Sequence, residues 1–147
     1  MDIDKLREEL EYDEGRVDEV YHDHLGLPTF GIGHLVLESD PEHGEPVGTA
    51  VSSDRVEAVF AEDVEKVCAD CTILFPNFDD LPEEIQHVIA NMMFNMGRPR
   101  LSKFKKFIGA VNDSDWMEAS AQMEDSRWYK QVTKRAQRLR DRVEALA

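Results

Sequence analysis

The spacing of apolar residues changes near residue 53, and before that point it predicts one helix and two short strands. Ile3, Leu6 and Leu10 recur at the three-to-four-residue spacing of an amphipathic helix. Gly15 follows and offers a stop for that helix. Residues 17–21 then alternate between apolar and polar side chains, which predicts a strand.

The remainder of the N-terminal third predicts a hairpin followed by a loop. Residues 24–26 are typical of a turn, and residues 29–35 predict a second strand that glycines interrupt. Residues 38–51 are polar and predict a loop, because they include Pro41, Gly44, Pro46 and Gly48.

From residue 53 onward the pattern is helical. Asp54 with Glu57 resembles a capping box and opens a long helix that ends before Pro76. A second helix is predicted from Pro82 to Gly97. Three more are predicted: one from Phe104 to Val111, one opened by Asp115 with Glu118, and one carrying Ala136, Leu139, Val143 and Leu146. The fold class is therefore α+β and mostly helical, with a small α/β lobe before a helical one.

Composition indicates a folded, acidic protein of a single domain. The chain has 147 residues, 41% of them hydrophobic, and its 17 basic and 31 acidic side chains give a net charge of −14. Residues 1–97 carry −19 and residues 98–147 carry +5. This balance argues against general nucleic-acid binding and suits a cleft with one acidic and one basic wall. Acidity that only aids solubility is the alternative.

The sequence offers no sign of a membrane span, an export signal or a metal site. It has no run of about 18 apolar residues, and its first residues lack a basic and then apolar leader. We therefore expect a cytoplasmic location until something releases the protein. Cys68 and Cys71 form a CxxC pair within a helical pattern, but no second ligand pair accompanies them. Reduced cysteines, no metal and no cofactor are expected.

The candidate chemistry lies in the N-terminal third. Glu14 and Asp23 are nine residues apart, and Thr29 and a Gly-x-Gly-His segment at 31–34 follow them. Hydrolysis of a glycosidic bond uses two carboxylates with different tasks, which this group could supply. Each residue also has a plainer interpretation: a solvated Glu14, a turn-forming Asp23, a strand-favouring Thr29 and a structural histidine at position 34.

Motifs in a fixed order cover nearly the whole chain: Asp13-Glu14-Gly15, Tyr21-x-Asp23, Thr29-x-Gly31-Ile32-Gly33-His34-Leu35, Asp63-Val64, Asn91-Met92-x-Phe94-x-Met96-Gly97, Trp116-x-Glu118-Ala119, Ser126-Arg127-Trp128-Tyr129 and Arg135-Ala136-x-Arg138. Together they resemble the phage-type lysozyme family, glycoside hydrolase family 24. The resemblance implies one lysozyme domain of two lobes with a cleft between them. The expected parts are an N-terminal lobe at about 13–52, a linking helix at 53–74, and a helical lobe at 75–147 that includes the first helix, 3–12.

The same resemblance implies hydrolysis of the β-1,4 bond between N-acetylmuramic acid and N-acetylglucosamine in peptidoglycan. Glu14 would be the general acid. Asp23 would hold the attacking water or stabilise the cationic sugar, and Thr29 would help to place that water. The family is inverting, which implies carboxyl groups about 6.5–9.5 Å apart.

Supporting residues are also implied by the resemblance. His34 and Asp63 match a structural ion pair, and Arg135 matches an arginine that reaches towards Glu14. Such an arginine would lower the pKa of the acid, whereas burial and a helix C-terminus would raise it, and the sequence leaves the outcome open.

Four further residues match positions that contact the sugar chain. Leu35 and Phe94 match cleft residues of the family, while Phe107 and Gln122 stand where the family has Ser and Asn. Phe107 would narrow or repack the cleft, so the resemblance leaves the subsite preference open.

The implied partner is bacterial peptidoglycan, with no nucleic acid, no stable membrane association and a monomeric state. The implied role is that of an endolysin, which waits in the host cytoplasm until the membrane is permeabilised and then acts on the wall in the periplasm. Two other functions remain: a wall-binding module of the same fold that has lost catalysis, and an acidic mimic of nucleic acid.

Overall fold

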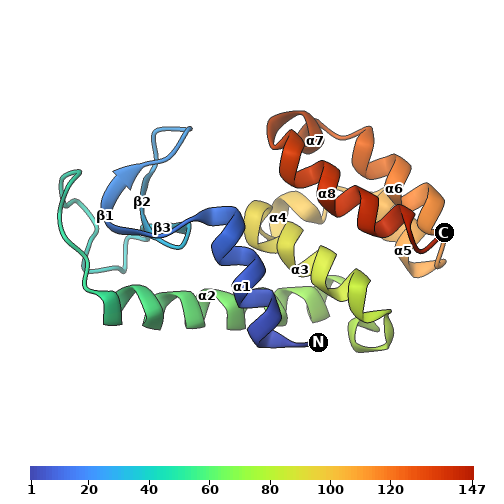
Figure 1. Ribbon diagram of the computed structural model, residues 1–147, viewed down its shortest axis with the longest axis horizontal. Helices are drawn as coiled ribbons and strands as arrows, with labels where there is room; N and C mark the ends of the chain where they lie inside the picture. The colour runs from blue at the N-terminus through green and yellow to red at the C-terminus, as the bar shows by residue number, and fades with distance from the viewer. The chain divides into compact units, whose positions relative to one another are not determined.

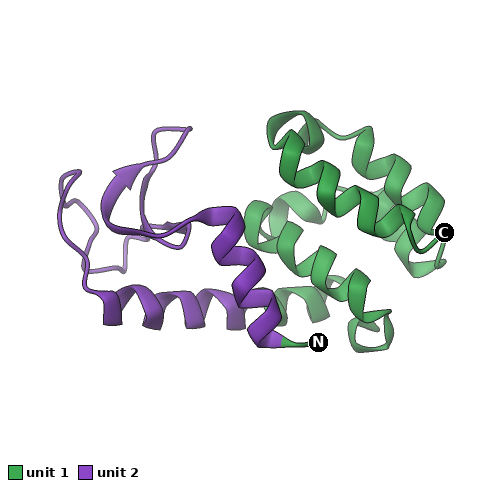
Figure 2. Ribbon diagram, in the orientation of Figure 1, with its two compact units in different colours: residues 1–2, 67–147 green, residues 3–66 purple.

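The computed structural model describes residues 1–147, which divide into two compact units (Figure 2). Unit 2 consists of residues 3–66, and unit 1 of residues 1–2 and 67–147. The chain is 61% helical with eight α-helices and a three-stranded antiparallel sheet, which confirms the α+β, mostly helical class. The units group the first helix with the sheet, whereas the sequence placed residues 3–12 with the helical lobe. The expected lobe boundaries stay predictions.

Unit 2 contains the first helix, the sheet and the start of a long helix (Figure 1). Its elements are α1 (Ile3–Glu14), β1 (Val17–His22), β2 (Pro28–Gly31), β3 (His34–Leu35) and the first part of α2 (Ser53–Leu74). Leu6 and Leu10 of α1 are fully buried, as their spacing predicts. The helix ends where predicted, with the amide of Gly15 donating to the carbonyl of Glu11 at 2.8 Å.

The expected single strand at 29–35 is two strands. The sheet has the order β1-β2-β3, and Thr29 pairs with Tyr21 on one side and with Leu35 on the other. The chain reverses between β2 and β3 because Gly31 and Gly33 adopt φ values of +65° and +64°, which glycine reaches without steric cost. The alternating pattern of residues 29–35 continues through this reversal, so it did not reveal the turn.

The loop predicted at 38–51 is present, and a hydrogen bond joins its last residue to β1. The amide of Val51 donates to the carbonyl of Asp18 at 2.9 Å. Helix α2 then begins at Ser53. Ser52, and not Asp54, caps it, because the Ser52 hydroxyl accepts from the amide of Arg55 at 3.1 Å.

Unit 1 is helical. After the end of α2 it contains a 3₁₀ turn, η1 (Phe78–Asp80), and the helices α3 (Glu83–Met96), α4 (Arg98–Leu101), α5 (Lys105–Asn112), α6 (Trp116–Glu124), α7 (Arg127–Gln131) and α8 (Thr133–Glu144). Helix α3 is buried on most sides, with Val88, Ile89 and Met92 each 0% exposed, so it forms the core of this unit. The predicted capping role of Asp115 is confirmed, because its Oδ1 accepts from the amide of Glu118 at 3.1 Å. The short helices α4 and α7 were not predicted.

The two cysteines are free thiols on α2. Cys71 is fully buried and Cys68 half-buried, and burial raises the pKa of the Cys71 thiol far above its usual value. None of the helices combines the length and the apolar character needed to cross a membrane.

Candidate active site

Glu14 is the last residue of α1, and its side chain lies against the turn between β2 and β3. A Cβ atom placed on Gly33 would be 2.5 Å from Oε1 of Glu14 and 2.9 Å from its Cδ. Any larger residue at position 33 would therefore collide with the carboxyl group. Glu14 is half-buried, so its plainer interpretation as a fully solvated glutamate does not describe its surroundings.

Asp23 follows β1 and closes the hairpin turn to β2. Its Oδ1 accepts hydrogen bonds from the amides of Leu25 and Leu27, both at 2.9 Å. The turn role anticipated for an aspartate here is therefore present. It engages one carboxylate oxygen, and Oδ2 takes no part in these two bonds, so the turn role does not exclude a chemical one.

Thr29 lies on the middle strand and is only 2% exposed. Its hydroxyl donates to the carbonyl of Leu27 at 3.0 Å. This bond uses the hydroxyl hydrogen and leaves the oxygen able to accept a hydrogen bond.

Tyr21 connects these residues, although the sequence alone indicated no role for it. It is half-buried on β1, directly opposite Thr29. Burial raises the pKa of its phenol, and the charges of Glu14 and Asp23 raise it further. Both carboxylates therefore act on one phenol group. The Tyr21-x-Asp23 spacing was the only sequence signal that could have indicated a role for Tyr21.

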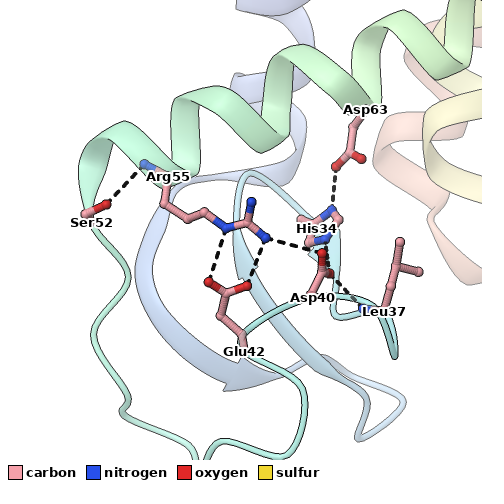
Figure 3. A network of polar contacts seen from close by, with 7 residues as sticks. All are labelled: His34, Leu37, Asp40, Glu42, Ser52, Arg55 and Asp63. Carbon is pink, nitrogen blue, oxygen red and sulfur yellow. Dashed lines mark hydrogen bonds and ion pairs between the residues drawn. The ribbon is translucent and has the colours of Figure 1, made fainter.

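A polar network surrounds His34 (Figure 3). The ring atom Nδ1 of His34 lies 2.7 Å from Oδ2 of Asp63, which is the contact expected from the sequence. The other ring nitrogen, Nε2, lies 2.8 Å from Oδ2 of Asp40. Arg55 contacts Asp40 at 3.2 Å and Glu42 at 3.0 Å, so the network joins β3 and the following loop to α2. The sequence did not predict that Asp40, Glu42 and Arg55 belong to this network, since nothing in their spacing links them to His34.

The network favours a charged histidine between charged carboxylates. Burial lowers the pKa of His34, but its hydrogen bonds to Asp63 and Asp40 raise it by more, so the pKa lies above 6.5. Burial raises the pKa of Asp40, but the amide of Leu37 and His34 lower it to below 3.8. The protonated ring of His34 can donate one hydrogen bond to Asp63 and one to Asp40.

The family model for phage lysozyme matches residues 11–145. The chain belongs to the phage lysozyme family. It is a glycoside hydrolase of the lysozyme class. The family match covers nearly the whole chain and agrees with the resemblance seen in the sequence motifs.

Several known proteins are similar to this lysozyme. "Probable T4-type lysozyme 2" of Dictyostelium discoideum is 30% identical, with 93% of this chain and 92% of the relative aligned. "Pre-baseplate central spike protein Gp5" of Enterobacteria phage T4 is 28% identical over 91% of this chain, which covers 26% of that protein. "Peptidoglycan hydrolase gp36" of Pseudomonas phage phiKMV is 26% identical over 93% of this chain, which covers 15% of that protein.

The expected sugar-contacting residues of the lysozyme have different exposures. Leu35 on β3 is 46% exposed, and Phe94 on α3 is half-buried. Gln122 on α6 is half-buried and donates from Nε2 to Oε1 of Glu118 at 2.7 Å. Phe107 on α5 is only 1% exposed, so it is a core residue, and any effect on a sugar would act through packing.

Arg135 is held by its own unit. The Nε of this α8 residue donates to Oδ1 of Asn91 on α3 at 2.8 Å. Its expected approach to Glu14 stays a prediction.

Proposed function

We propose that the enzyme hydrolyses the β-1,4 bond between N-acetylmuramic acid and N-acetylglucosamine in peptidoglycan. Membership of the phage lysozyme family supports this substrate, as does the relative named as a peptidoglycan hydrolase. In our proposal Glu14 is the general acid, and Asp23 and Thr29 hold the attacking water.

Glu14 is suited to protonate the glycosidic oxygen because it ends α1 beside the turn between β2 and β3. Gly33 has no Cβ and so leaves room for the carboxyl group there. A proton donor held at one place contributes more to catalysis than one that samples many positions.

Asp23 and Thr29 are suited to hold a water molecule between them. Two backbone amides hold Oδ1 of Asp23, so Oδ2 is the oxygen that would accept a proton from the water. The Thr29 oxygen would accept the second hydrogen, because its own hydrogen is directed to Leu27. Water attacking from the side opposite the leaving group gives inversion, in keeping with carboxyl groups about 6.5–9.5 Å apart.

One observation carries the proposal: the charges of Glu14 and Asp23 both act on the phenol of Tyr21, which is paired with Thr29 across the sheet. This supports our proposal that the three side chains act around one small region of unit 2.

The decisive experiment compares Glu14→Gln with Glu11→Gln. Both changes remove one negative charge from α1, but Glu11 is exposed and lies outside the group around Tyr21. Gram-negative cells with permeabilised outer membranes are treated with wild type and both variants, and turbidity and released muropeptides are followed. We expect clearing by wild type and Glu11→Gln, and at least a 10²-fold loss with Glu14→Gln.

The same assay tests the alternative functions. Binding to walls without clearing by the wild type would support a module that has lost catalysis. Neither binding nor clearing would support the nucleic-acid mimic. NMR of the first product tests the stereochemistry, since inversion yields the α-anomer of the new reducing sugar.

The biological setting in our proposal is that of an endolysin. The enzyme would be held in the host cytoplasm and act as a monomer on the wall once the membrane is permeabilised. Fractionation of host cells before and after permeabilisation tests this, because enzyme that reaches the periplasm beforehand would contradict it.

A further inference from the structure

Tyr21 is related to each of the three proposed catalytic residues. It is paired directly with Thr29 on the neighbouring strand, and such pairs bring side chains on one face to about 4.5–5.5 Å. Asp23 follows β1 in the hairpin turn, and its charge acts on the phenol of Tyr21. Glu14 ends α1 beside the turn between β2 and β3, and its charge acts on the same phenol.

The charges around Tyr21 keep its phenol protonated. Burial and the negative charges of Glu14 and Asp23 raise the pKa of the phenol. A phenol next to two carboxylates is therefore a neutral O–H donor over the whole range in which a lysozyme is assayed. In the proposed arrangement Asp23 accepts from the water and the Thr29 hydrogen is directed to Leu27, so Tyr21 supplies a donor to the water that these two residues lack.

We infer that Tyr21 is a positioning residue, which donates a hydrogen bond to the attacking water that Asp23 and Thr29 hold. The inference rests on the proposed function. A water molecule has two hydrogens and two lone pairs. Donation to Asp23 and Thr29 engages both hydrogens, and acceptance from Tyr21 engages one lone pair. The second lone pair is then the only one that can attack, and its direction is fixed by three contacts.

The first test is Tyr21→Phe, with Tyr12→Phe as the matched control. Tyr12 lies on α1 and is 79% exposed. Soluble peptidoglycan strands serve as substrate, and new reducing ends give kcat and KM. We expect kcat of Tyr21→Phe to fall about three- to tenfold with KM unchanged, which is the value of one hydrogen bond made in the transition state. Tyr12→Phe should match wild type.

The second test separates donation from packing. The chain has three tyrosines, so Tyr12→Phe combined with Tyr129→Phe leaves Tyr21 as the only one. Uniform incorporation of 3-fluorotyrosine then acidifies this phenol and preserves its ring. At neutral pH we expect the fluorinated and unfluorinated double variants to have similar kcat values. At alkaline pH we expect kcat to fall in the fluorinated protein and not in the unfluorinated one. A ring that only packs would show no such fall.

The outcomes distinguish this inference from the proposed function. If Glu14→Gln is inactive while Tyr21→Phe keeps the kcat of wild type, the role of Tyr21 is overturned and that of Glu14 stands. An active Glu14→Gln variant overturns both. Circular dichroism and thermal melts of Tyr21→Phe identify a folding defect, and in that case the fluorinated protein decides.

Discussion

Replacing Gly33 with alanine tests how Glu14 is positioned. The new Cβ would lie 2.5 Å from Oε1 of Glu14, whereas ordinary van der Waals contact begins at 3.4 Å. The carboxyl group would therefore have to move by about 0.9 Å. Displacements of about 1 Å cost on the order of 10²-fold in rate when they misplace a reacting group. We expect kcat of Gly33→Ala to fall by about that factor.

The same substitution also strains the backbone, so a matched control is needed. Gly33 has φ of +64°, and an alanine there costs about 1–2 kcal/mol of folding free energy. For a chain of this size the melting temperature would fall by about 2–4 °C per kcal/mol. Gly44 has φ of +83°, and a Cβ added there would have no atom within 4 Å. Gly44→Ala therefore carries the strain without touching Glu14.

The assay combines calorimetry with the release of reducing ends from soluble peptidoglycan strands. Similar losses of stability in both variants, with a large loss of kcat only in Gly33→Ala, would support the reasoning. A folded Gly33→Ala enzyme with the kcat of wild type would refute it. So would an equal loss of kcat in Gly44→Ala, because backbone strain alone would then explain the effect.

Two further predictions concern stability. Because the pKa of His34 is raised, its charged ring contributes fully to the free energy of unfolding below pH 6.5. This contribution is lost as the pH rises through the folded-state pKa. The lowered pKa of Asp40 means that its contribution is present above pH 3.8 and is lost as the pH falls through its folded-state pKa. The difference in free energy of unfolding between wild type and His34→Gln, measured by urea denaturation, should therefore shrink as the pH rises from below 6.5 to alkaline values. A constant difference would contradict this. Because the Phe107 side chain is 1% exposed, Phe107→Ala should cost about 3–5 kcal/mol of folding free energy. The protein that remains folded should have the KM of wild type. An unchanged melting temperature with a raised KM would instead indicate direct contact between Phe107 and the sugar.

The sequence predicted the fold best where long periodic patterns meet clear boundaries. The end of α1, the end of α3 at Gly97 and the cap of α6 at Asp115 all lie where expected. Helices α4 and α7 were missed because each spans about one turn, which is too short for a periodic pattern. The cap of α2 was predicted at Asp54 but is Ser52, because Ser52, Ser53 and Asp54 can each cap a helix, and only the backbone geometry selects one.

The proposed site residues were chosen from the sequence, whereas the contacts around them come from the structure. Asp23 and Thr29 flank one hairpin turn, so local structure is enough to relate these two proposed residues. The partners of His34 on the loop and on α2 come from the tertiary fold. Asp40 and Arg55 are 15 residues apart, and no local pattern predicts that both join one network.

The two glycines of the Gly-x-Gly segment explain how so small a sheet can pack closely against two helices. A sheet of three short strands has little stability of its own and needs a helix to pack on. At Gly31 the backbone approaches α2 so closely that a Cβ would lie 3.1 Å from Cγ1 of Val56. At Gly33 it approaches Glu14 at the end of α1. Because both glycines lack side chains, one turn can contact two helices. His34, which follows this turn, also binds Asp63 of α2 and Asp40 of the next loop. The Gly-x-Gly segment is therefore, in this chain, the place where Glu14 lies against the small sheet.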